Sequence, residues 1–123
     1  MSLRKLGQVG EALAQNYLKQ HNCTVITTNY RSRFGEIDII AKEEDCYVFV
    51  EVKTRSSKRF GSPLEAVTFR KRQRLWLTAQ DWVGKHNLGV EEPAFRFDVL
   101  SIIIGNDGLA AITHDKGVFG EVE

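Results

Sequence analysis

Hydrophobic and polar positions follow two different periods along the chain. Apolar side chains recur every three or four positions over residues 4–21 and 69–85, which predicts two amphipathic helices. Stretches rich in β-branched and aromatic residues predict strands at 23–30, 35–42, 46–54 and 94–104, and a turn signal at 106–108 predicts a short fifth strand at 109–113. Residues 62–67 predict a short helical turn, and residues 87–93 predict a loop.

This order of elements predicts an α/β fold with a single mixed β-sheet flanked by helices, in the order α-β-β-β-α-β with room for an extra strand. The 123 residues fit one domain, although Met1–Leu3 could come from a cloning vector and the segment after His114 has no clear assignment. Neither a membrane-spanning run nor a signal-peptide pattern is present, so we expect a cytoplasmic protein with no membrane partner.

Two predicted strands carry acidic residues inside their most apolar segments. Asp38 interrupts the run 37–41, and Glu51 interrupts the run 48–52. Carboxylates are rarely buried in such runs unless something pairs with them. The two strands therefore hold candidate functional residues.

An antiparallel hairpin that turns at residues 44–45 would place Asp38 opposite Glu51 and Glu36 opposite Lys53. The other face would then be aliphatic, with Ile37, Ile39, Ala41, Val48, Val50 and Val52. Two opposed carboxylates repel each other, so something must offset their charge. A shared Lys53 would make a salt-bridged strand face, whereas a divalent cation such as Mg²⁺ would make a metal site.

Positive charge is concentrated next to these acids. Residues 53–74 contain eight basic side chains and one acidic one, whereas the rest of the chain has nine basic and fifteen acidic residues. A localised basic patch is typical of contact with a phosphate backbone, although many charge runs are simply solvated surface. His21, His86 and His114 are scattered near segment ends, where surface roles are usual, and we assign them no chemistry.

Glu11 borders the apolar stripe of the first predicted helix. Gly7 and Gly10 would let this helix approach the sheet closely and bring Glu11 toward the strand acids. An ordinary surface glutamate is the alternative interpretation.

Glu11, Asp38 and the segment Glu51-Val52-Lys53 together resemble the active-site pattern of the restriction-endonuclease-like superfamily, an acid followed by (Asp/Glu)-x-Lys. More narrowly, the chain resembles the YraN-like family of small, largely uncharacterised bacterial proteins, which are similar to archaeal Holliday-junction resolvases. The resemblance rests on Gly-Glu-Ile-Asp at 35–38, Val-Glu-Val-Lys-Thr-Arg at 50–55, Gly10-Glu11, and the segments 72–75 and 96–99.

The resemblance implies one nuclease-like domain with Mg²⁺ or Mn²⁺ bound by Asp38, Glu51 and the backbone carbonyl of Val52. Lys53 would orient the attacking water or offset charge on the phosphate, and Glu11 would act through a water or complete a second metal site. Glu36 and Gln73 are candidates for the surroundings of the metal. The residues expected to contact phosphates are Arg31, Arg33, Arg55, Lys58, Arg70, Lys71 and Arg74.

The resulting hypothesis is a metal-dependent endonuclease that hydrolyses phosphodiester bonds in structured or branched DNA. The alternative is a non-catalytic nucleic-acid-binding module that keeps the nuclease fold. A hydrolase of a small phosphorylated molecule is less favoured, because the chain has no Gly-rich phosphate loop. Cutting two strands would favour a symmetric dimer, although no segment identifies itself as the interface.

Overall fold

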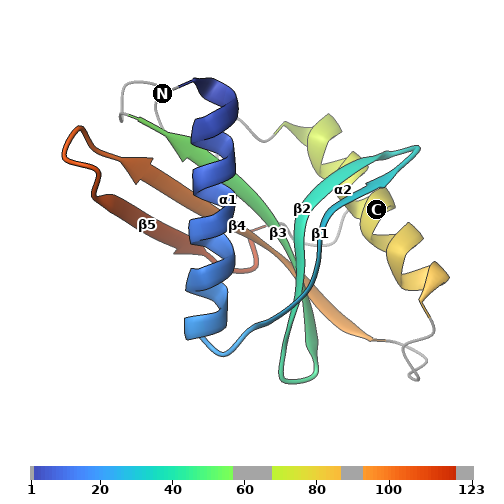
Figure 1. The fold of residues 1–123 in the computed structure, drawn as a ribbon. Coiled ribbons are helices and arrows are strands. Elements are labelled where there is room, and N and C mark those ends of the chain that lie inside the picture. The colour runs from blue at the N-terminus through green and yellow to red at the C-terminus, as the bar shows by residue number, and fades with distance from the viewer. Residues whose placement is uncertain (1, 57–67, 87–92, 119–123) are drawn as a thin grey trace.

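The computed structural model describes residues 2–56, 68–86 and 93–118 (Figure 1). In chain order its elements are α1 (Leu3–Gln20), β1 (Thr24–Ser32), β2 (Gly35–Glu43), β3 (Cys46–Arg55), α2 (Phe69–Lys85), β4 (Ala94–Ile104) and β5 (Ala110–Asp115). The predicted order, the extra strand and the α/β fold class are confirmed. The helical turn predicted at 62–67 lies outside the described residues, as does most of the loop predicted at 87–93.

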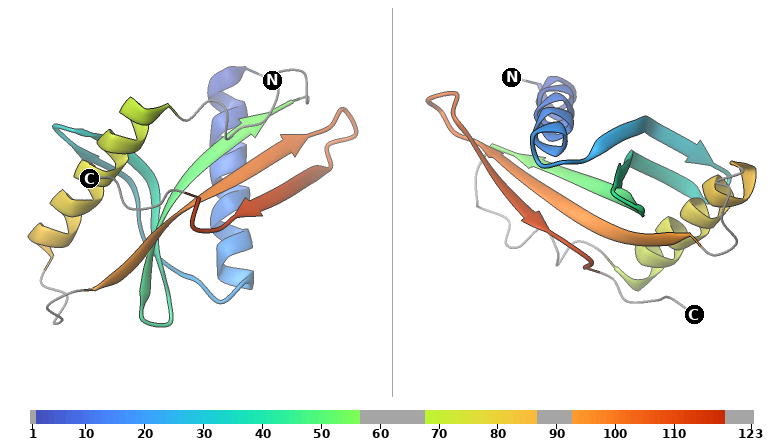
Figure 2. Two further views of the ribbon diagram at one scale, coloured as in Figure 1. Left: turned by 180° about the vertical axis from the view of Figure 1, so that it is seen from behind. Right: turned by 90° about the horizontal axis from the view of Figure 1, so that it is seen from below.

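The strands form one mixed sheet in the order β1-β2-β3-β4-β5. Strands β3 and β4 are parallel and are connected through α2, whereas the other neighbours are antiparallel. Helix α1 lies on one face of the sheet and α2 on the other, as the views in Figure 2 show. The molecule therefore has three layers, with a hydrophobic core on each side of the sheet.

Alternation along the strands divides the apolar side chains between the two cores. In β3, Val48 and Val50 pack toward Ala14 and Leu18 of α1, in a cluster that also holds Ile39, Ala41, Leu100 and Ile102. Tyr47 and Phe49 point to the other side, where Leu75, Ala79 and Trp82 of α2 meet Ile40 and Phe97. A period of two along one strand thus supplies both helices with apolar partners.

The predicted hairpin register is confirmed over half of β2, where Ile39 pairs with Val50 and Glu43 pairs with Cys46. The ladder between β2 and β3 ends at Ile39, so the expected pairings of Asp38 with Glu51 and of Glu36 with Lys53 are not formed. Beyond this point β3 continues beside β4, and β2 bends away together with β1 (Figure 1).

The predicted position of Ile37 on the face of Ile39 and Ala41 is wrong, because Ile37 packs in the cluster under α2. Opposite Asp38 on β1, Asn29 has a φ of 53°. This left-handed conformation, which asparagine tolerates better than most residues, interrupts the ladder between Thr28 and Tyr30. Beside this interruption, Ile37 and Ile39 pack on opposite faces of the sheet.

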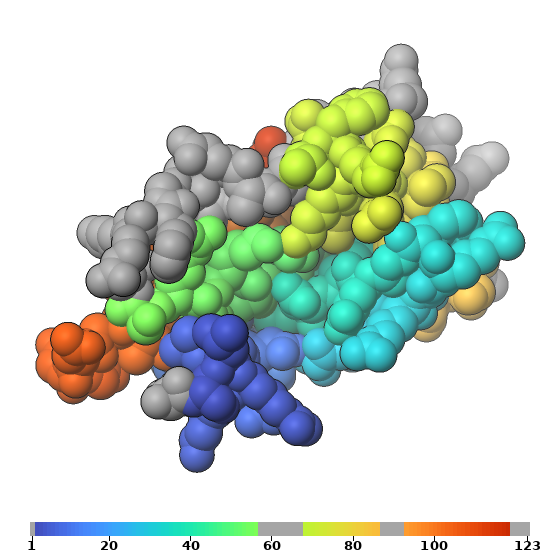
Figure 3. Space-filling view, turned by 90° about the horizontal axis from the view of Figure 1, so that it is seen from above, coloured from blue at the N-terminus to red at the C-terminus, as the bar shows by residue number. Residues whose placement is uncertain are grey.

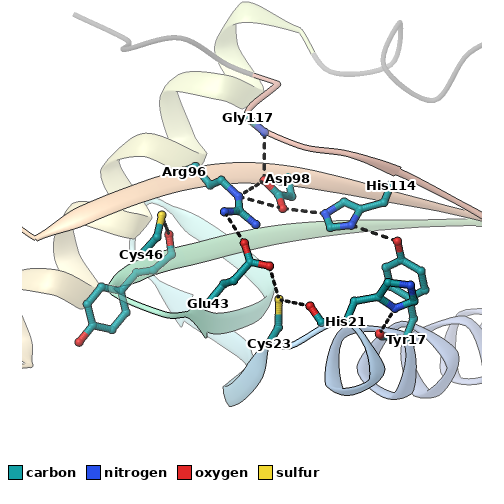
Figure 4. A network of polar contacts seen from close by, with 10 residues as sticks. Tyr17, His21, Cys23, Glu43, Cys46, Arg96, Asp98, His114 and Gly117 are labelled. Atoms are coloured by element: carbon teal, nitrogen blue, oxygen red, sulfur yellow. Dashed lines mark hydrogen bonds and ion pairs between the residues drawn. The ribbon is translucent and has the colours of Figure 1, made fainter.

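A buried polar network joins β4 to β5 on the side away from the β2 bend (Figure 4). The Asp98 side chain is fully buried, and its Oδ1 accepts hydrogen bonds from Arg96 Nε at 3.0 Å and from the Gly117 N–H at 3.0 Å. Its Oδ2 lies 2.7 Å from Nε2 of His114, whose Nδ1 lies 3.2 Å from the Tyr17 hydroxyl. The surface role expected for His114 is therefore wrong, because this side chain is only 7% exposed.

Burial alone would raise the pKa of Asp98. The contacts with His114 and Arg96 and the hydrogen bond from Gly117 outweigh that effect and hold the pKa below its ordinary value. The Arg96 guanidinium also makes a 3.0 Å ion pair with Glu43 of β2. The network ties α1, β2, β4 and β5 together, so we assign it to stability.

Replacing Asp98 with alanine would leave His114 buried without its carboxylate and Arg96 with Glu43 alone. We expect Asp98→Ala to lower the free energy of unfolding by about 3–5 kcal/mol, as measured by urea denaturation. Asp45→Ala is the matched control, because Asp45 lies exposed in the β2–β3 turn. Equal destabilisation by the two substitutions would contradict a structural role for the network.

Candidate functional site

The candidate site lies at the point where β2 and β3 separate. Asp38 has no ladder partner in β1 or β3 among the described residues, and its Oδ2 accepts a 2.8 Å hydrogen bond from the Val52 N–H instead. A carboxylate thus takes the place of a neighbouring strand's carbonyl. This contact fixes the Asp38 side chain between the two diverging strands.

The electrostatic environment of Asp38 opposes its ionisation. Burial raises the pKa of this carboxyl from 3.8 to about 7, and the negative charges of Glu51, Glu11 and Glu36 act in the same direction. The hydrogen bond from Val52 acts against the increase without cancelling it. The site therefore holds more negative charge than the surrounding protein stabilises.

Glu51 is compensated by two lysines. Its Oε1 lies 2.8 Å from Nζ of Lys71 at the start of α2 and 3.3 Å from Nζ of Lys53. Its side chain is only 11% exposed, so the three groups form a partly buried cluster. Burial and the neighbouring Lys71 ammonium lower the pKa of Lys53. Burial would also lower the pKa of Lys71. The contact of Lys71 with Glu51 outweighs the effect of burial, and the pKa of Lys71 is raised.

Glu11 approaches Asp38 from α1. A side chain at Gly10 would overlap Thr54 of β3, so the glycine permits the helix to lie directly on the strand, as predicted. Oε1 of Glu11 is buried and has no hydrogen-bond partner within the part of the chain that the structure describes. A buried carboxylate oxygen without a donor is rare in a native protein and is explained by strain, by a functional role, or by a bound water or ion.

Two clefts open on the end of the sheet where both helices begin (Figure 3). The α2 cleft has a volume of about 510 Å³ and is lined by Gly35, Glu36, Asp38, Glu51, Thr68, Arg70, Lys71, Arg74 and Leu75. The α1 cleft has a volume of about 360 Å³ and is lined by Leu3, Arg4, Leu6, Gly7, Gln8, Glu11, Asp38, Val52 and Thr54. Asp38 belongs to both clefts and separates them.

The predicted phosphate-binding residues are placed unevenly. Arg70, Lys71 and Arg74 line the α2 cleft. Arg31 and Arg33 lie in the β1–β2 hairpin near this cleft, where Arg31 makes a 3.7 Å ion pair with Glu36.

Three further predicted residues lie at or beyond the margins of the site. Arg55 ends β3 beside Ile103, and Lys58 lies outside the described residues. Gln73 is exposed on α2 and does not line either cleft, as far as the described residues show. Of the two residues expected to surround the metal, Glu36 lines a cleft, whereas Gln73 does not within the described residues.

Sequence reasoning missed Arg4 and Gln8, which line the α1 cleft. Their spacing was a usable signal, because residues three and seven positions before Glu11 share its side of a helix. It also treated Lys71 only as a phosphate contact, whereas this lysine is the nearer partner of Glu51. No local pattern joins residues 51 and 71, so that contact needed the three-dimensional fold.

Fold and site together define an α/β protein with a mixed sheet between two helices and an acid-lysine cluster at the end of the sheet. The sequence profile of "Uncharacterised protein family UPF0102" matches residues 10–102. The chain belongs to this family, as the resemblance to YraN-like proteins predicted.

Relatives in several bacteria agree with this assignment. A UPF0102 protein of Caldicellulosiruptor bescii is 42% identical over 97% of this chain and 100% of its own. One of Rhodococcus jostii is 45% identical over 93% of this chain and 95% of its own, and one of Aliivibrio fischeri strain MJ11 is 46% identical over 80% of each. Neither described helix is long and apolar enough to cross a membrane.

The raised pKa of Asp38 makes a testable prediction about stability. Between pH 4 and pH 8 the unfolded chain loses the Asp38 proton more readily than the folded one, so this group lowers stability as the pH rises. In a metal-free buffer containing EDTA, we expect Asp38→Asn to melt close to the wild type at pH 4 and at a higher temperature at pH 8. Asp45→Asn should show no such pH-dependent difference, and a constant offset for Asp38→Asn would refute the prediction.

Proposed function

We propose that the protein is a Mg²⁺- or Mn²⁺-dependent endonuclease that hydrolyses phosphodiester bonds in structured or branched DNA. The observation that carries the proposal is the convergence of Asp38, Glu51 and Glu11 beside Lys53, at a surface where cationic side chains line a cleft. Both helices also point their N-termini toward this end of the sheet, which favours an anionic ligand (Figure 3).

The residues present fit a hard divalent cation. The unpartnered Oε1 of Glu11 and the raised pKa of Asp38 are both features that a nearby cation would relieve. Within the described residues, no group of three or more His, Cys, Asp or Glu side chains is placed so that it could hold a metal ion by itself. Mg²⁺ does not need such a group, because it keeps several waters and commonly binds one or two carboxylates together with a substrate phosphate.

Asp38, one oxygen of Glu51 and the carbonyl of Val52 would hold the ion, with Glu11 acting through a water. The ion, when bound, would polarise a phosphodiester oxygen. Hydrolysis adds the oxygen of a water to phosphorus and breaks one bond to a sugar oxygen. The Lys53 ammonium would offset the charge that develops on the phosphate, and Lys71 would hold Glu51 in place.

The substrate class follows from the contacts that the α2 cleft offers. Arg70 and Arg74 would bind backbone phosphates, which position a nucleic acid without reading its bases. A preference for the shape of the substrate over its sequence is therefore expected.

One observation favours the non-catalytic alternative. Oε1 of Glu51 already has two ammonium partners without any metal, as in a structural salt bridge. A nucleic-acid-binding module would keep this cluster and use the cationic cleft only to hold its ligand. Metal-dependent cleavage distinguishes the two functions.

The decisive experiment incubates the protein with labelled duplex, single-stranded, flap and four-way-junction DNA in Mg²⁺ or Mn²⁺. We expect metal-dependent cutting of at least one substrate and its loss in Asp38→Asn. The matched control Lys19→Ala, at the far end of α1, should cut normally. Tight binding by both proteins without cutting would favour the binding module.

A second prediction concerns Lys53. We expect Lys53→Ala to lower the cleavage rate about a hundredfold or more, because a charge-stabilising donor is lost, while DNA affinity changes little. Single-turnover cleavage and fluorescence anisotropy measure the two quantities separately. Unchanged cleavage would remove Lys53 from the mechanism.

A further inference from the structure

The two clefts that share Asp38 differ in the chemistry of their walls. The α2 cleft carries Arg70, Lys71 and Arg74, whereas Arg4 is the one cationic side chain among the described residues that line the α1 cleft. The α1 cleft has a mainly polar lining, to which Leu6 and Val52 add apolar side chains. The two clefts therefore differ chiefly in their number of cationic side chains.

The part of the α1 cleft that is lined by carboxylates repels phosphate. Asp38 and Glu11 both line it, and Oε1 of Glu11 is buried without a donor in the described part of the chain. A phosphate group there would face two carboxylates with little compensation. A neutral group with an apolar face and polar edges fits these walls better.

We propose that the α1 cleft is a subsite for one unpaired nucleotide adjacent to the scissile phosphodiester. The inference rests on the proposed nuclease function and narrows its substrate to nucleic acids with a single-stranded end or branch at the cut. Asp38 is shared by both clefts, so a strand that leaves the α2 cleft and enters the α1 cleft must pass this residue.

An unpaired base can use the contacts that the cleft offers. Its face would pack on Leu6 and Val52, a contact that is closed to a base stacked inside a duplex. The exposed Gln8 amide carries both a donor and acceptors for the polar edge of a base. Arg4, exposed one turn earlier on the same helix, would meet the next phosphate along the strand.

The test measures binding in EDTA, so that it does not depend on cleavage. Fluorescence anisotropy compares a blunt duplex, the same duplex with a short single-stranded overhang, and an overhang with an abasic first nucleotide. We expect the ordinary overhang to bind about tenfold more tightly than the blunt and abasic forms. Gln8→Ala and Leu6→Ala should reduce this preference and leave affinity for the blunt duplex unchanged.

A control pair separates this inference from the proposed function. Arg70→Ala together with Arg74→Ala should weaken binding of all three DNAs by the same factor, because those residues contact phosphates. Gln8 is exposed, so its replacement by alanine should preserve the fold, which circular dichroism checks. Equal affinity for the three DNAs in the wild type, or failure to bind any of them, would overturn the subsite. The proposed function fails separately, if no DNA is cut in Mg²⁺ or Mn²⁺.

Discussion

The hydrogen bond from the Val52 N–H to the Asp38 carboxylate is the contact on which the arrangement of the site depends. In a continuous sheet this donor would meet a carbonyl of the neighbouring strand. Here a side chain takes that place, and β2 is free to turn toward α2 while β3 stays beside β4. Asp38 therefore stabilises the opening between β2 and β3 and also places a carboxylate in it.

Charge around this opening is distributed unequally between the two faces of the sheet. On the side of α2 the carboxylate of Glu51 is neutralised by lysines, whereas on the side of α1 an oxygen of Glu11 has no donor within the described residues. A protein selected for stability alone would not be expected to keep such an imbalance, because unsatisfied buried groups cost free energy. Local conflict of this kind is typical of functional sites.

Local periodicity sufficed to predict the elements, the register of the inner half of the hairpin and the closeness of α1 to the sheet. It failed at Ile37, which packs on the opposite face from Ile39, next to the left-handed Asn29 on the neighbouring strand β1. It also missed the Asp98–His114 contact, since residues on two paired strands become neighbours only through the register of β4 and β5. Asparagine within a β-rich run was the available warning for the first failure.

The position of Glu11 in the site depends on Gly10, a residue that carries no charge itself. The helix rests on Thr54 because nothing projects from this position, and the reach of Glu11 toward Asp38 is set by that distance. One added methyl group would act as a spacer, moving a carboxylate without altering any charge in the sequence. Relatives with a larger residue at this position would therefore differ in the arrangement of these acids, although their acidic residues would be the same.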